Sequence, residues 1–209
     1  MTLANVTSQR LKSASVAAMF AFSGAVGAVP VLTSFTPTAV YFGEAHSLGY
    51  QFVTTTPLQV NSLGYYDSGL DGLVANHSVG IYSAGGTLLG SAVVGPSATT
   101  LLGDFRYVNL ASPINLATGT TYYIAGTVGG DSDGWVYQAS NILTSGINYT
   151  GSYYALKATS LTFPVSPATT REYMTVSFDA TPVAEPQVYT LMLARLATVG
   201  LVGHRRRPR

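Results

Sequence analysis

Two glycine-rich turns of this chain each hold a pair of carboxylates. Asp67 and Asp71 lie in the first turn, over residues 67–72, and Asp131 and Asp133 lie in the second, over residues 131–134. Hard cations such as Ca²⁺ take several oxygen ligands, and glycine permits the sharp turns that bring those ligands together. Aspartate, serine and glycine are equally common in turns that bind nothing. The four aspartates are therefore candidate calcium ligands, and ordinary structural turns are the alternative interpretation.

Aromatic residues follow the second acidic turn. Trp135 and Tyr137 come directly after it, and Tyr149, Tyr153 and Tyr154 lie further along the chain. Exposed aromatic rings on a sheet can stack on sugar rings, but aromatic residues also bury a large area in cores. The sequence leaves both interpretations open, and Trp135 and Tyr137 are its candidate residues for binding polysaccharide.

No catalytic motif is recognisable in the sequence. His-Glu-x-x-His, Gly-x-Ser-x-Gly and dinucleotide-binding patterns are absent. Cysteine is absent too, which excludes disulfides, thiolate metal sites and a cysteine nucleophile. His46 and His77 have no partner at a ligand spacing and are interpreted as loop residues. We therefore predict no catalytic residues and no enzymatic activity.

Charged residues make up only 9% of the 209 residues and apolar residues 47%, against roughly 25% charged in a typical soluble domain. Such a chain is too apolar to remain disordered. Residues 29–180 hold three lysines and arginines against eight acidic side chains, a formal charge of −5. Binding to phosphate backbones needs clustered cations on a folded surface, so nucleic acid is excluded as a main partner.

Short runs of alternating apolar and polar residues fill the middle of the chain. They include residues 121–128, 149–156 and 173–180, of which the last is the clearest, and a Gly-Gly turn at 85–86 predicts a hairpin. No helical period lasts three turns between residues 30 and 180. These patterns predict an all-β fold over residues 29–180, an antiparallel β-sandwich that is jelly-roll-like.

Residues 1–28 have the three parts of a secretory signal peptide. Arg10 and Lys12 form a basic region, residues 14–22 form an apolar region, and residues 26–28 (Val-Gly-Ala) fit the small-x-small cleavage pattern. The apolar region is too short to span a bilayer comfortably. We expect a signal helix here, export by the Sec machinery, and a mature chain that begins at Val29.

The C-terminal residues have the pattern of a second targeting signal. A linker at residues 181–187 precedes an apolar stretch at residues 188–203, and the basic tail at 204–209 contains Arg205, Arg206 and Arg207. Arginines resist translocation and stay in the cytoplasm. The pattern predicts a short transmembrane helix that ends in a stop-transfer signal.

The linker also carries a sorting motif, Val183, Ala184, Glu185 and Pro186. With the helix and the arginines, it resembles the PEP-CTERM signal of Gram-negative, exopolysaccharide-producing bacteria, with Ala184 in place of the first proline. The resemblance implies that an integral-membrane exosortase processes an inner-membrane-anchored precursor for the cell surface or the extracellular space. Residues 48–129 are similar to small all-β domains of unknown function carried by such proteins.

These observations predict a non-enzymatic exported protein of the cell surface or exopolysaccharide matrix, with polysaccharide as its candidate ligand. One alternative is an adhesion module stabilised by calcium, the one candidate cofactor. The other is a glycoside hydrolase or polysaccharide lyase, and a hydrolase requires two carboxylates roughly 5–10 Å apart in a cleft. The places of Trp135 and of the acidic turns on the folded surface separate these alternatives.

Overall fold

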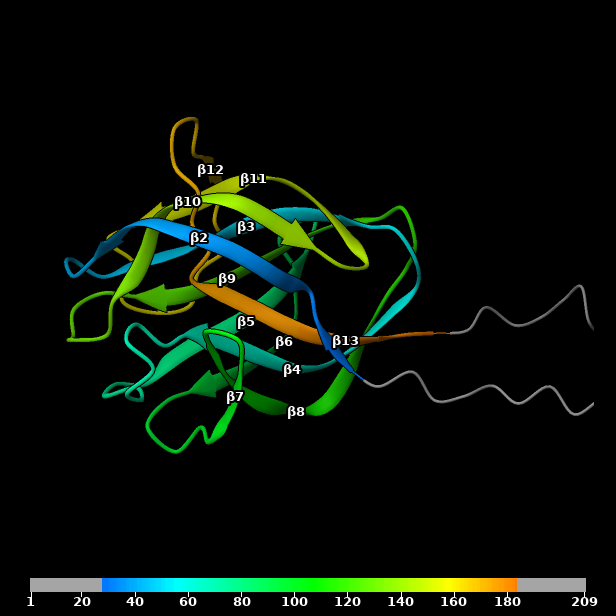
Figure 1. Cartoon of the computed structure of the whole chain (residues 1–209). Coiled ribbons are helices and arrows are strands. Elements are labelled where there is room, and N and C mark those ends of the chain that lie inside the picture. The colour runs from blue at the N-terminus through cyan, green and yellow to red at the C-terminus, as the bar shows by residue number, and fades with distance from the viewer. Residues whose placement is uncertain (1–27, 184–209) are drawn as a thin grey trace, which may run out of the picture.

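The computed structural model describes residues 28–183, and within this range it contains strands, turns and loops but no α-helix. Every strand pair is antiparallel (Figure 1). The predicted all-β, antiparallel fold class is confirmed for these residues. None of them belongs to a helix long and apolar enough to cross a bilayer.

The strands form two large sheets and one small sheet. In order across the five-stranded sheet lie β1 (Val29–Pro30), β13 (Val176–Pro182), β4 (Leu58–Tyr66), β8 (Phe105–Leu116) and β7 (Thr100–Leu102). The six-stranded sheet consists of β12 (Ser166–Pro167), β11 (Ile147–Leu156), β3 (His46–Thr54), β9 (Thr121–Val128), β5 (His77–Ser83) and β6 (Leu88–Val94). The small sheet pairs β10 (Trp135–Thr144) with β2 (Leu32–Tyr41).

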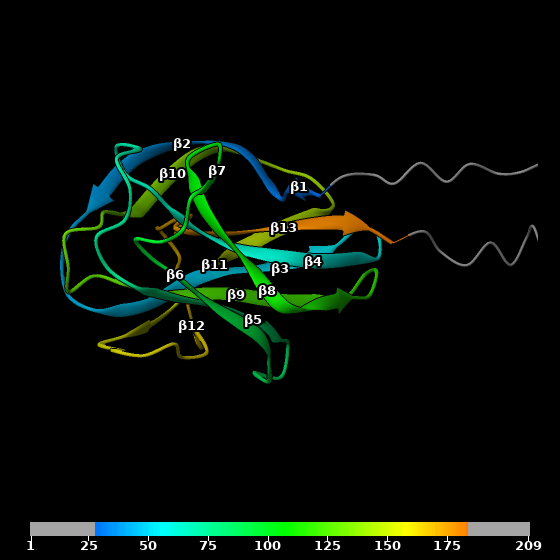
Figure 2. The ribbon, with the colours of Figure 1, turned by 90° about the horizontal axis from the view of Figure 1, so that it is seen from below.

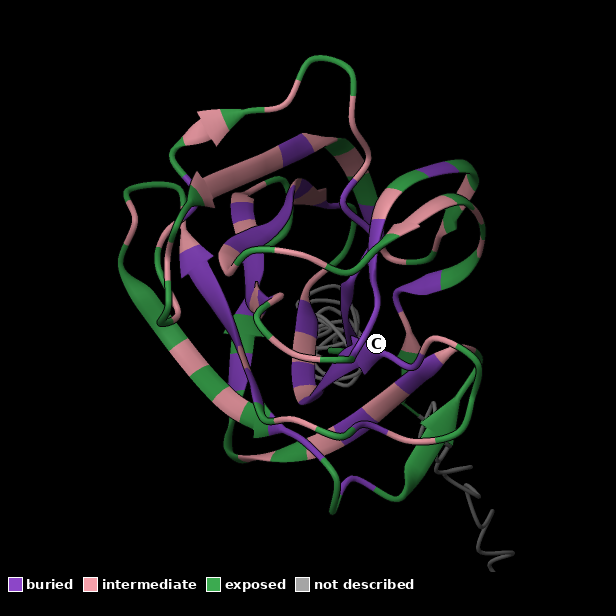
Figure 3. Cartoon of the chain, turned by 90° about the vertical axis from the view of Figure 1, so that its left-hand side faces the viewer, coloured by how far each residue is buried: buried purple, intermediate pink, exposed green. Residues whose placement is uncertain are grey.

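The two large sheets pack face to face in a sandwich-like arrangement, with the core between them. Phe52 of β3 meets Phe178 of β13 across this space, with ring centroids 5.2 Å apart. Both rings are fully buried, as are Tyr65 and Ile124. Figure 3 shows buried residues in purple along the strands that face the interior. Burying each such side chain contributes about 1.5–3 kcal/mol to stability, so these alternating positions hold the sheets together.

Most of the predicted strand runs are present in the structure. The run at residues 121–128 coincides with β9, and the turn at 85–86 joins β5 to β6 as predicted. The strand predicted at 173–180 begins later, at Val176. Its polar face is buried as well as its apolar one, because the Thr175 hydroxyl accepts from the Val136 N–H and the Tyr107 hydroxyl donates to Ser177.

The two ends of the described chain lie side by side at one end of the molecule (Figure 2). Val29 of β1 pairs with Ala180 of β13. From there β2 runs the length of the molecule, so that Tyr41 at its far end pairs with Trp135 at the start of β10. The segment around Trp135 therefore lies far from both chain ends.

Several predictions fall outside the described residues. These are the signal peptide, the motif residues Ala184, Glu185 and Pro186, the helix at residues 188–203, and the tail with Arg205, Arg206 and Arg207. Val183 is the last described residue, and its N–H donates to the Pro57 carbonyl at 2.9 Å.

Candidate functional site

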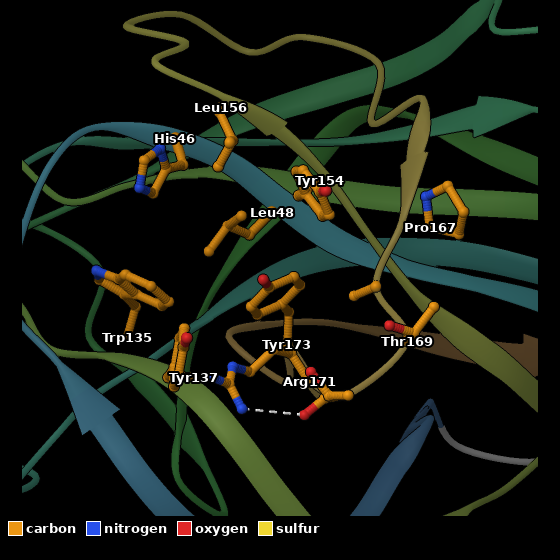
Figure 4. A pocket seen from close by; sticks show the side chains of 12 residues that line it. His46, Leu48, Trp135, Tyr137, Tyr154, Leu156, Pro167, Thr169, Arg171 and Tyr173 are labelled. Carbon is orange, nitrogen blue, oxygen red and sulfur yellow. Dashed lines mark hydrogen bonds between the residues drawn. The ribbon is translucent and has the colours of Figure 1, made fainter.

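A pocket of about 390 Å³ opens at the end of the molecule opposite the chain ends. Its walls come from the first residues of β3 and β10, the last residues of β11, and the segment 167–173 that crosses over them. Figure 4 shows these side chains arranged around Tyr173. We call this the aromatic pocket, and its volume is in the range typical of small-ligand sites.

Four aromatic side chains line the pocket. Trp135 and Tyr137 share one face of β10 because side chains two residues apart point the same way along a strand. Their ring centroids are 5.7 Å apart, and those of Tyr137 and Tyr173 are 6.2 Å apart. Tyr154 of β11 meets Tyr173 edge to face at 6.3 Å. The rings thus form one continuous surface drawn from two strands and the crossing segment.

The two candidate binding residues, Trp135 and Tyr137, are buried to different extents. Trp135 is only 3% exposed, although it lines the pocket, because Tyr41 covers it with ring centroids 5.5 Å apart. Tyr137 is half-buried. Trp135 therefore packs into the core and also forms a wall of the pocket, and sugar binding by these residues stays a prediction. The buried Nε1 of Trp135 has no hydrogen-bond partner within the part of the chain that the structure describes.

Hydrogen-bond donors surround the rings. The guanidinium carbon of Arg171 lies 4.3 Å from the centroid of the Tyr137 ring, within the range of a cation–π interaction. Its Nη1 donates to the Thr170 carbonyl at 3.2 Å (dashed line in Figure 4). His46 accepts at Nδ1 from the backbone N–H of Lys157 at 3.1 Å. A backbone N–H can only donate, so the neutral His46 ring carries its hydrogen on Nε2.

Among residues 28–183, no carboxylate lines the aromatic pocket. Glu172 follows Arg171 in the chain, but its carboxylate instead accepts a hydrogen bond from the Tyr149 hydroxyl. Burial raises the pKa of Glu172 above its ordinary value. The facing pair of carboxylates that glycoside hydrolysis requires is therefore absent from this pocket.

The first acidic turn is held by contacts within the protein. Asp67 is 1% exposed, and its carboxylate accepts from Nε of Arg106 at 2.7 Å and from the N–H of Gly72 at 3.2 Å. Asp71 is exposed. Within residues 28–183, neither aspartate belongs to a group of three side chains spaced as metal ligands. The contacts of Asp67 are those of a structural turn.

The second acidic turn joins a buried histidine. His77, Asp131 and Asp133 present ligand-type atoms within 4.8 Å of one another. Asp133 accepts from Nε2 of His77 at 2.8 Å, from the Val74 N–H at 2.9 Å and from the Ala75 N–H at 2.8 Å. We call His77 and Asp133 the buried pair. Calcium binding by the four aspartates stays a prediction, but the structure does not bring all four carboxylates together.

The interpretation of both histidines as loop residues was wrong. His77 begins β5 and is 1% exposed, stacked on Tyr65 with ring centroids 3.7 Å apart. His46 begins β3 and lines the aromatic pocket. Sequence spacing could not reveal either role, because the partners of these rings lie about 50 to 110 residues away along the chain.

Sequence reasoning also missed Arg171 and the segment that carries it. The available signal was the scarcity of cations, since Arg106, Lys157 and Arg171 are the three lysines and arginines of residues 28–183. An isolated cation in an acidic domain is either paired with an acid or exposed for a partner. The sequence contains this signal but not the contact that distinguishes the two cases.

Fold and site together define an all-β domain with an aromatic, carboxylate-free pocket at one end. Residues 34–175 match a protein family described as a domain of unknown function (DUF4082). The match spans more than half of the chain, so the protein belongs to this family. It also includes every residue that lines the aromatic pocket. No curated protein matches the chain.

Proposed function

We propose that this protein is an exported, non-enzymatic polysaccharide-binding protein of the cell surface or exopolysaccharide matrix of a Gram-negative bacterium. The observation that carries the proposal is the aromatic pocket. Stacked on a sugar ring, Tyr154 would cover its apolar face, while His46 and Arg171, held over the Tyr137 ring, would donate hydrogen bonds to its oxygens. The absence of carboxylates from the walls favours binding over hydrolysis at this pocket.

Sequence features support the location. The three-part signal at residues 1–28 favours export by the Sec machinery. The motif at residues 183–186, the apolar stretch at 188–203 and the terminal arginines favour a membrane-anchored precursor that an exosortase processes. Processing after about residue 186 would release the domain or attach it to the surface.

We also propose that the sandwich has jelly-roll topology. The strand order supports this, since β1-β13-β4-β8 lie side by side in one sheet and β3-β9-β5-β6 in the other. Along the chain, consecutive members of this set change sheet at every step except from β5 to β6. Such repeated crossing between two sheets is typical of a jelly roll.

Fluorescence of the single tryptophan tests the binding proposal, because Trp135 lines the aromatic pocket and no other indole contributes. Titration with soluble neutral and acidic polysaccharides should shift its emission for at least one of them. Tyr137→Ala should weaken that binding about tenfold or more, since it removes the ring that holds Arg171 at the pocket. Isothermal titration calorimetry gives the same comparison without an optical probe.

Tyr153→Ala is the matched control. Tyr153 is half-buried like Tyr137, but it packs on Tyr123 at 5.0 Å and does not line the pocket. This variant should bind as the wild type does. Equal loss of affinity in both variants, or no emission change with any polysaccharide, would contradict binding in the aromatic pocket.

A further inference from the structure

The cations of this domain are distributed unevenly. Residues 28–183 hold three lysines and arginines against eight acidic side chains. Arg106 is neutralised by the buried carboxylate of Asp67, with Nε 2.7 Å from Oδ2. The other two, Lys157 and Arg171, both belong to segments at the aromatic pocket. Lys157 follows Leu156 of the pocket wall, and its backbone N–H holds the His46 ring.

Arg171 is the cation that reaches into the pocket. Its guanidinium has no carboxylate within 4 Å among the described residues, and its one hydrogen bond there is to the Thr170 carbonyl. Tyr137 orients the planar group by stacking beneath it. The guanidinium has five N–H donors, so most of them stay free for a ligand.

The other groups that line the pocket also favour a negatively charged ligand. None of the eight acidic side chains lines the pocket, while the wall offers the Nε2–H of His46 and the hydroxyls of Thr169 and Thr170. An oxyanion placed here meets donors and one unpaired cation, and no like charge lies on the walls. In an otherwise acidic domain, this makes the pocket a local site for negative charge.

We infer that the aromatic pocket selects a uronic-acid saccharide, with Arg171, held over the Tyr137 ring, binding the sugar carboxylate and Tyr154 stacking on the sugar ring. The inference rests on the proposed polysaccharide binding and names its substrate class. A planar guanidinium matches a carboxylate in a bidentate pair, and such charge-assisted hydrogen bonds are the strong ones. The ring surface adds the selectivity for a sugar over a small free anion.

A matched pair of ligands tests whether the pocket prefers a charged sugar. The full-length protein is titrated with a galacturonic acid hexamer and with the fully methyl-esterified hexamer, which has the same sugar chain without the charges. EDTA is present, so that metal bridging does not contribute. Trp135 emission and calorimetry should both show the acid form binding about tenfold or more tightly than the ester.

Arg171→Gln then identifies the group responsible. This variant should bind the acid form and the ester with equal affinity, because it removes the positive charge that distinguishes them. Arg171→Lys should recover only part of the preference, because an ammonium lacks the planar fork. Melting curves of the variants should lie close to that of the wild type, since Arg171 is half-buried and its one protein acceptor is the adjacent Thr170 carbonyl.

Different results would contradict the inference and the proposed function. Equal affinity for the two hexamers, binding of neutral polysaccharides alone, or a preference that survives in Arg171→Gln would each overturn the inference and leave the proposed function in place. Absence of binding to either hexamer and to every other polysaccharide would overturn both.

Discussion

The buried pair of His77 and Asp133 ties three parts of the chain together. Asp133 follows β9, His77 begins β5, and the N–H groups of Val74 and Ala75 come from the loop before it. The other nitrogen of the His77 ring, Nδ1, lies 3.0 Å from the Thr127 carbonyl. Each oxygen of the Asp133 carboxylate therefore faces donors from the protein, which makes this turn a structural junction beside the pocket wall at Trp135.

Replacing Asp133 by asparagine should destabilise the fold strongly. The change leaves His77 without its carboxylate and turns an amide toward the donors of the loop, and breaking a buried pair in this way costs about 3–5 kcal/mol. Urea unfolding of Asp133→Asn measures the loss. Asp71→Asn is the matched control, because Asp71 is exposed and the change should stay within about 0.5 kcal/mol. Similar stabilities for the two variants would contradict the structural role of Asp133.

The same residue predicts an acid dependence of stability. Burial by itself raises the pKa of Asp133, but hydrogen bonds from the Val74 N–H, from His77 and from the Ala75 N–H outweigh it and leave the pKa lowered. The stability that Asp133 contributes is therefore fully present above its unfolded pKa of about 3.9 and is lost as pH falls through the lower folded value. The difference in melting temperature between wild type and Asp133→Asn should shrink over that window.

Individual residues of the site were only partly predictable from the sequence. Trp135 and Tyr137 could be paired because two residues of separation place side chains on one face of a strand. Arg171 and His46 could not be added to them. They reach the pocket through the crossing segment and the β3–β11 pairing, and such long-range contacts leave no local pattern.

Among the elements, β2 shows why some strands escape sequence analysis. It is ten residues long, contains Pro37 and pairs only with β10. A proline lacks the N–H that a central strand needs, so it is tolerated in a strand with an unpaired side. The pairing also shifts register several times, which removes a clean alternation of apolar residues. The central strand β9, paired on both sides, has the bounds that the sequence predicted.

The contact between β3 and β9 at Gly49 predicts the effect of adding a single methyl group. Gly49 of β3 lies opposite Ala125 of β9, and a Cβ at Gly49 would stand 1.8 Å from the Ile124 carbonyl oxygen. Backbone cannot yield as a side chain does, so Gly49→Ala should cost about 3 kcal/mol or more in urea unfolding.

Gly85→Ala is the control for that variant, since the nearest atom to its Cβ would be Oγ of Ser83 at 4.0 Å. It should unfold within about 0.5 kcal/mol of the wild type. If Gly49→Ala matched it, the close packing of β3 against β9 would be wrong, and with it the position of His46 at the start of β3.

At the scale of the whole molecule, the pocket and the chain ends occupy opposite ends of the sandwich. The pairing of Val29 with Ala180 brings the two ends together, and β2 and β10 carry the chain to the pocket. A domain held through residues beyond 183 would therefore present the aromatic pocket away from its attachment point. This arrangement suits the proposed role, because a long polysaccharide can reach the pocket without passing the anchoring surface.

The same arrangement bears on where the mature chain begins. β1 starts at Val29, so cleavage after Ala28 removes no residue of any described strand and leaves the pairing with β13 intact. We expect protein recovered from the periplasm or medium of a Gram-negative host to begin near Val29, as intact-mass analysis would show. Ala28→Gln should block cleavage because the last signal residue must be small, whereas Gly27→Gln changes the unrestricted position beside it and should be processed normally. Recovery of an exported species that still begins at Met1 would contradict the signal peptide, and equal processing of the two variants would move the cleavage site elsewhere.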